Sequence, residues 1–116
     1  MSRSKILLIL TALAIALTLT ACGGMSGTPP SITTQPQDQT VPVGALARFS
    51  VTASGSVPLQ YQWMLNGMAI SGATSSSYVT PSVMLTDNNE QFSVVVSNSS
   101  GSVTSNTATL KVLAVP

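Results

Sequence analysis

Histidine is absent from this 116-residue sequence, cysteine occurs once, and charged side chains make up only 6% of the chain. Without histidine, the chain cannot form a Ser-His-Asp triad or a histidine-based metal site. Because Cys22 is the only cysteine, the fold has to be stable without an intramolecular disulfide. With so few charges, the polar surface must come from Ser, Thr, Asn and Gln, which favours an exported β protein over a cytosolic enzyme.

Other catalytic arrangements are missing from the sequence too. The serines stand in expected loops and on polar strand faces, where no base is available to activate them. No glycine-rich phosphate loop stands at a strand-to-helix junction. We therefore predict a protein that is not an enzyme and that binds no cofactor.

The densest group of oxygen-bearing side chains is the segment DNNE at residues 87–90. Calcium needs six to eight oxygen ligands, but this segment offers only the two carboxylates of Asp87 and Glu90. Asp and Asn also favour turns, because their side chains bond to nearby backbone groups. We interpret the segment as a turn and predict no metal site.

Residues 1–21 have the pattern of a lipoprotein signal peptide. Two basic residues, Arg3 and Lys5, precede an apolar run over residues 6–19, which is shorter than the roughly 20 residues of a membrane-spanning helix. The run ends in LTAC, and small residues before a cysteine resemble a bacterial lipobox. The resemblance implies cleavage before Cys22 and lipid attachment to it. An ordinary signal peptide with an incidental cysteine is the alternative.

Cleavage at this point would leave a nearly neutral protein held at a membrane. Two basic residues then stand against three acidic ones, so the formal side-chain charge is −1. No basic patch remains, so we expect no nucleic-acid partner. Residues 22–30 are expected to be the lipidated cysteine and a flexible tether, about 25–30 Å long when extended. The expected location is the cell envelope, facing the periplasm or the exterior.

The segment 59–67 organises the predicted folded part. Large apolar side chains stand at the odd positions from 59 to 65 and glutamines at 60 and 62, a period of two that predicts a half-buried strand. Asn66-Gly67 then favours a tight hairpin turn. Trp63 is the only tryptophan, and aromatic residues make up 4% of the chain, so we expect its ring at the centre of the core.

The rest of residues 31–112 reads as short strands separated by turn residues, the pattern of an all-β sandwich. In the last strand, residues 102–112, the apolar positions switch from odd to even numbers. This switch predicts a β-bulge near Ser105-Asn106. Residues 113–116 are expected to be a C-terminal tail.

Four motifs in this order resemble a bacterial immunoglobulin-like domain of the intermediate-set kind. They are ARFSV at 47–51, YQW at 61–63, LTD at 85–87 and VVVSNSSG at 94–101. The resemblance implies an immunoglobulin-like β-sandwich of two antiparallel sheets without a disulfide, covering residues 31–112.

The resemblance also assigns the core. Val51 and Val94 stand where the family's inter-sheet cysteines usually sit, so an apolar contact beneath Trp63 is expected instead of the bridge. Phe92 takes the place of the family's corner tyrosine, whose hydroxyl hydrogen bond is therefore lost. Together with Trp63, these residues are expected to pin the core.

If Trp63 and Val94 point inward, four neighbours point outward: Gln62, Met64, Ser93 and Val95. Met64 and Val95 would then be apolar side chains on a solvent face, where they suit contact with a partner. The resemblance implies a non-catalytic module for binding, adhesion or spacing, with an envelope protein or another copy as partner. A carbohydrate-binding or enzyme-accessory module is the alternative, and the domain could be one unit of a tandem array.

Overall fold

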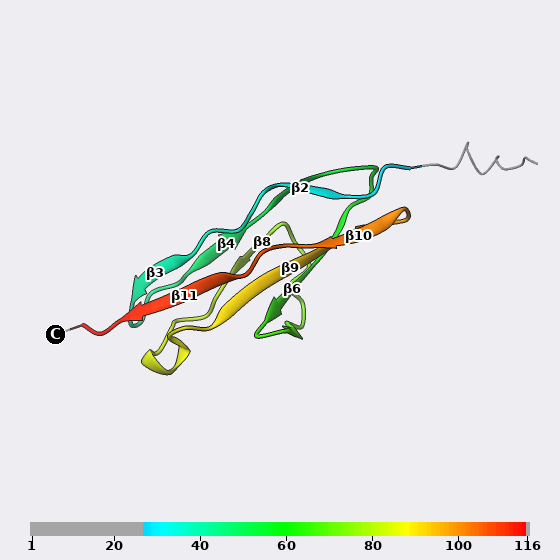
Figure 1. Ribbon diagram of the computed structural model, residues 1–116. Helices are drawn as coiled ribbons and strands as arrows, with labels where there is room; N and C mark the ends of the chain where they lie inside the picture. Colours follow the sequence, from blue (N-terminus) through cyan, green and yellow to red (C-terminus); the bar gives the residue numbers. More distant parts are fainter. Residues whose placement is uncertain (1–26, 116) are drawn as a thin grey trace, which may run out of the picture.

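The computed structural model describes residues 27–115, so the signal peptide, Cys22 and the first part of the tether lie outside the described residues. Two β-sheets pack face to face along one long axis (Figure 1). The strands are β2 (Ser31–Thr34), β3 (Gln39–Pro42), β4 (Arg48–Ser50), β5 (Thr52–Ser54), β6 (Gln60–Leu65), β7 (Met68–Ala69), β8 (Ser77–Val79), β9 (Gln91–Asn98), β10 (Gly101–Thr104) and β11 (Ala108–Leu113). A single 3₁₀ turn, η2 (Leu85–Asp87), joins β8 to β9. Within this part of the chain, no helix has the length and apolar character needed to cross a membrane.

The larger sheet has the order β3-β11-β9-β6-β7, and β10 also pairs with β9. The other layer consists of the pairs β2–β5 and β4–β8, which are continuous because only Val51 separates β4 from β5. This arrangement confirms the predicted all-β sandwich. One pair departs from the antiparallel rule, since β3 runs parallel to β11 after the chain changes sheets near the buried Pro36.

The core forms because alternate residues of each strand face the opposite sheet. In β9, Phe92, Val94 and Val96 are at most 2% exposed, while the residues between them are half-buried. Trp63 is 0% exposed, and its indole Nε1 donates to the Ser75 carbonyl at 2.8 Å, so the buried N–H group keeps a partner.

The other expected core residues are buried as well. Val51 is 5% exposed and belongs to the same apolar cluster as Val94. The Phe92 ring stacks on Phe49 with centroids 4.6 Å apart and lies 5.8 Å from the Tyr78 ring. At this position, aromatic packing therefore takes the place of a tyrosine hydroxyl contact.

The predicted bulge in the last strand is confirmed by the register. Thr104 lies opposite Val95 and Ala108 opposite Phe92, so four steps along β10–β11 match three along β9. Ser105 occupies the irregular position: its N–H donates to the Val94 carbonyl, and its Oγ accepts from the Val94 N–H, both at 2.9 Å. The extra residue returns the apolar residues of both halves to the core.

The folded part begins before residue 31, because the end of the expected tether is held against the domain. The Thr28 N–H donates to Ser56 Oγ at 2.7 Å, and the Thr28 carbonyl accepts from the Asn98 amide at 2.8 Å. Pro30 is buried. The flexible tether is therefore shorter than its predicted length.

The segment at 87–90 forms the turn between η2 and β9, in which its side chains bond to neighbouring strands and loops. Asp87 Oδ2 accepts from the Met84 N–H at 2.9 Å, and Asn88 Oδ1 accepts from the Val112 N–H at 2.8 Å. Asn89 adopts a φ of 73°, a conformation that Asn tolerates better than most residues. These contacts agree with the turn interpretation.

Candidate binding surface

The outward face of β6 and β9 brings the four predicted contact residues together in two cross-strand pairs. Gln62 lies opposite Val95, and Met64 lies opposite Ser93. Between them, Trp63 and Val94 point into the core, so the parity assigned from the sequence holds. Side chains paired across strands in this way act as one surface.

These four side chains are half-buried, whereas the sequence interpretation placed Met64 and Val95 fully in water. One reason is that the Gln62 amide folds back over the sheet edge. Its Nε2 donates to the Ile70 carbonyl at 2.8 Å and to the Trp63 carbonyl at 2.9 Å. Strand β10 also covers part of the face, because Thr104 lies beside Val95.

This face carries no charge. Strands β6, β9 and β10 contain no Asp, Glu, Lys or Arg at all. Next to the pair of Gln62 and Val95, a second row runs across the sheet from Gln60 through Ser97 to Ser102. The surface therefore combines small polar groups with the side chains of Met64 and Val95.

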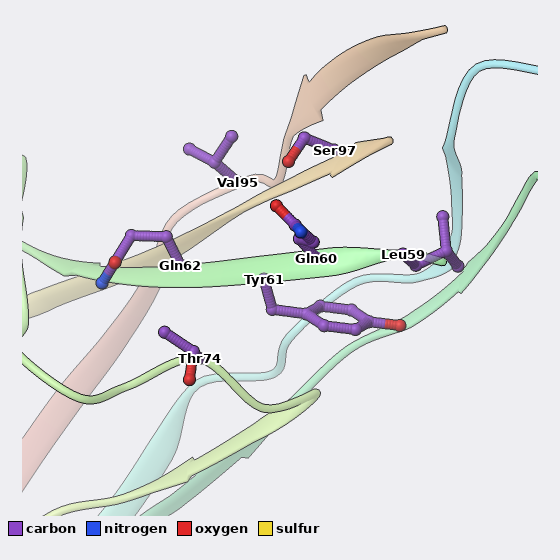
Figure 2. A pocket seen from close by; sticks show the side chains of 7 residues that line it. All are labelled: Leu59, Gln60, Tyr61, Gln62, Thr74, Val95 and Ser97. Atoms are coloured by element: carbon purple, nitrogen blue, oxygen red, sulfur yellow. The ribbon is translucent and has the colours of Figure 1, made fainter. Parts of the chain in front are cut away.

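A hollow of about 470 Å³ opens at the edge of this face (Figure 2). In the figure, Tyr61 projects from the other side of β6 than Gln60 and Gln62, and Thr74 approaches from the loop after β7. The lining residues are Leu59, Gln60, Tyr61, Gln62, Thr74, Val95 and Ser97.

Sequence reasoning missed two components of this hollow. Tyr61 was assigned to the core by its parity, but it is only half-buried because it lies near the start of β6. Thr74 belongs to a polar loop whose path has no local sequence signal. The alternation along β6 could have identified Gln60, which faces the same way as Gln62 and Met64.

A second hollow, about 290 Å³, lies at the opposite end of β6. Leu65, Tyr78, Met84 and Phe92 contribute to its apolar wall, and Asp87 and Glu90 add carboxyl groups. Burial raises the pKa of Glu90, and the negative charge of Asp87 and a hydrogen bond with it raise this pKa further.

Burial likewise raises the pKa of Tyr78, with a smaller contribution from the charge of Glu90. The acidic side chains here have no further ligands around them: the described residues contain no group of three or more side chains able to hold a metal ion. The second hollow therefore concerns stability more than chemistry.

Comparison with known proteins gives one partial sequence match. A stretch of 42 residues, 36% of this chain, is 48% identical to titin of Drosophila melanogaster. The stretch amounts to 0% of titin after rounding, so it says nothing about the function of the whole relative.

Solved structures show the same fold. A titin domain in complex with an obscurin-like 1 immunoglobulin domain superposes with a TM-score of 0.68 at 20% identity, covering 78% of this chain and 99% of that chain. Chimeric titin carrying an exogenous decorin peptide gives 0.65 at 25% identity, covering 78% and 100%. The immunoglobulin domains of Sidekick-1 give 0.67 at 20% identity, covering 78% of this chain and 21% of that chain.

A family model described as "Immunoglobulin domain" matches residues 29–113. Its limits agree with the folded part, which begins at the held end of the tether and includes all of β11. With the sandwich topology and the core already described, the chain belongs to the immunoglobulin domain family.

Proposed function

We propose that this protein is a non-catalytic, lipid-anchored immunoglobulin-like module of a bacterial cell envelope, which binds another protein. The observation that carries the proposal is the uncharged face of β6, β9 and β10, with its paired residues Gln62–Val95 and Met64–Ser93. We call this surface the neutral face.

The neutral face suits a protein contact because covering it costs little. Burying a charge without a partner is expensive, whereas small polar groups can exchange water for hydrogen bonds across an interface. The flexible thioether of Met64 can adjust to the shape of a partner. A formal charge of −1 after cleavage would offer little long-range steering, so complementarity at close contact would decide the partner.

The proposed anchor limits which partners can reach this face. Only five residues separate Cys22 from Thr28, the first residue with a described hydrogen bond to the domain. Even at full extension, the distance from the lipid to Thr28 is about 20 Å. The partner is then another protein of the same envelope or one on a closely opposed surface.

The anchor is tested by Cys22→Ser. Acyl chains on Cys22 would hold the protein firmly, since each buried CH₂ contributes about 0.8 kcal/mol. We expect the unsubstituted protein in the detergent phase of a phase partition and the variant without lipid mass. Recovery of the unsubstituted protein in the aqueous phase, with an unlipidated N-terminus, would rule out the anchor.

The neutral face is tested by Met64→Lys combined with Val95→Lys in the full-length protein. A matched control, Ser50→Lys with Thr52→Lys, adds the same charge to exposed positions of the other sheet. We expect the control to retain its cross-linked envelope partner and the neutral-face variant to lose it, with both still folded by circular dichroism. If the first variant unfolds, Ser93→Lys replaces it, because that change removes no apolar contact. A folded neutral-face variant that keeps its partner contradicts the proposal.

A carbohydrate-binding role is the second candidate, because the Tyr61 ring stands beside the amides of Gln60 and Gln62 in the first hollow. Sugars are commonly bound by an aromatic ring together with polar side chains. Here only one aromatic side chain lines the hollow. Glycan-array binding that is lost in Tyr61→Ala and kept in the neutral-face variant would favour this second role.

A further inference from the structure

The peptide groups of β6 alternate between its two neighbours, and the hydrogen bonds show which residues face which side. The Trp63 N–H donates to the Ala73 carbonyl, and the Trp63 carbonyl accepts from the Ile70 N–H, both at 2.9 Å and on the side away from β9. On the other side, the Asn66 N–H donates to the Gln91 carbonyl just beyond β9 at 2.8 Å. Odd-numbered residues of β6 therefore direct their N–H and C=O groups away from β9.

Tyr61 stands two residues before Trp63, so its main-chain N–H and C=O also point away from β9. Strand β7 pairs only with Met64 and Leu65, and Ala73 bonds only to Trp63. Among the described residues, no backbone group is hydrogen-bonded to the N–H or C=O of Tyr61 on this side.

The edge is open at Tyr61 because the loop after β7 leaves for the other sheet. The Ser75 carbonyl accepts from the Trp63 indole at 2.8 Å, and the Ser76 carbonyl accepts from the Val51 N–H at 3.0 Å. The loop therefore crosses the side of the sandwich after Ala73 and does not continue along β6. The hollow of about 470 Å³ with Tyr61 and Thr74 in its lining is the space left at this point (Figure 2).

We propose that an extended segment of the partner protein occupies this hollow and adds to β6 as a further strand. This inference deepens the proposed function, because it names the chemistry by which a partner is recognised. An N–H and a C=O directed outward from one residue of an edge strand match the main chain of another strand. Neither Lys nor a bulge protects this edge at Leu59–Gln62.

The surroundings define the segment further. The lining of the hollow is uncharged, so a partner segment with small, uncharged side chains keeps its hydrogen bonds without stranding a charge. Pro58, which has no N–H, stands just before the open edge. The added strand is therefore short, about three residues at the point of contact.

A second copy fits the hollow less well. Two β6 edges meeting antiparallel about a two-fold axis at Tyr61 would direct the N-termini of the two copies in opposite directions. Two copies anchored by their N-termini in one membrane cannot adopt this arrangement. The segment therefore belongs to a different protein.

The test uses a phage-displayed library of unstructured 12-residue peptides, selected on the full-length protein in detergent. The variants Tyr61→Val and Tyr61→Pro form a matched pair: both remove the ring, but only the proline removes the N–H group. A proline is tolerated at an edge position whose N–H faces outward. We expect selected peptides to lack charged residues and to bind Tyr61→Pro about three- to tenfold more weakly than Tyr61→Val.

Amide hydrogen exchange gives a second readout on the unsubstituted protein. The Tyr61 amide should exchange readily in the free protein and at least about tenfold more slowly with a selected peptide bound. The Trp63 amide, already bonded to Ala73, is the internal control and should change little. Equal binding to the proline and valine variants, or no protection at Tyr61, overturns strand addition.

Two other outcomes would also overturn it and remain distinct from failure of the proposed function. A library that yields no peptide leaves the neutral-face test with lysine variants unaffected. A dimer of the unsubstituted protein in analytical ultracentrifugation that is lost only in Tyr61→Pro would assign the edge to a second copy.

Discussion

Along β6, a sealed centre lies between two open ends. Trp63 is 0% exposed, its main chain is bonded to Ile70 and Ala73, and its indole is bonded to Ser75. Two residues before it, Tyr61 points the same way but is half-buried beside the first hollow. Two residues after it, Leu65 lines the second hollow. Three residues of equal parity thus differ because one short loop covers only the middle of the strand.

The comparison separates stability from recognition. At the centre, every polar group found its partner inside the molecule, so nothing remains for a ligand. At the Tyr61 end, main-chain groups face a hollow, and at the Leu65 end, carboxyl groups face an apolar wall. Substitutions along β6 should therefore have effects that fall sharply away from Trp63.

The largest effect is expected for Trp63→Ala. Removing a fully buried tryptophan costs about 3–5 kcal/mol in unfolding free energy, a large share of the stability of a small domain. Urea denaturation followed by circular dichroism measures the loss. A cost below about 1 kcal/mol would show that the centre is not sealed.

A stabilising change should come from Val51→Cys with Val94→Cys, which would restore a bridge behind Trp63. Closing a loop of this length contributes up to about 4 kcal/mol in the loop-entropy model, although strain can reduce the gain. The melting temperature of the oxidised variant, compared with its reduced form, measures the gain. Thiols that stay free under oxidising conditions would contradict the expected contact between these residues.

A smaller effect is expected for Tyr61→Ala. The ring is only half-buried, so its removal should cost about 1–2 kcal/mol, clearly less than the loss for Trp63→Ala. The two variants should be compared in the same urea series. Equal losses would remove the distinction between the closed and open parts of β6.

The smallest effect is expected at the Leu65 end, for Glu90→Gln. Because the folded state raises the pKa of Glu90, the folded protein binds more protons than the unfolded one, and stability falls as pH rises through the raised pKa. Glutamine removes this penalty, so the variant should be more stable at pH 7 by a few tenths of a kcal/mol.

Below the unfolded pKa, the Glu90 carboxyl is protonated in both states, and the stability difference should shrink. Urea midpoints at pH 7 and pH 3.5 test the sign. Asp38→Asn, at an exposed position outside both hollows, is the matched control. A larger advantage for Glu90→Gln in acid than at neutral pH would contradict the assigned direction.

Much of the fold followed from the sequence because period-two patterns are local. The parity of Trp63, Val94 and Val96 placed them in the core, and the switch of parity after Val103 predicted the bulge that Ser105 fills. The positions of Gln62 and Val95 on one outward face followed from the same rule.

The sequence by itself therefore determined which side chains point inward, where the chain turns and that no disulfide could form. Only the tertiary structure decided the parallel pairing of β3 with β11, the half-burial of Met64 and the open edge at Tyr61. The physical reason is that these features depend on where the loop after Ile70 crosses between sheets. That path is set by bonds from Trp63 and Val51 to Ser75 and Ser76, residues on different sheets that no local pattern brings together.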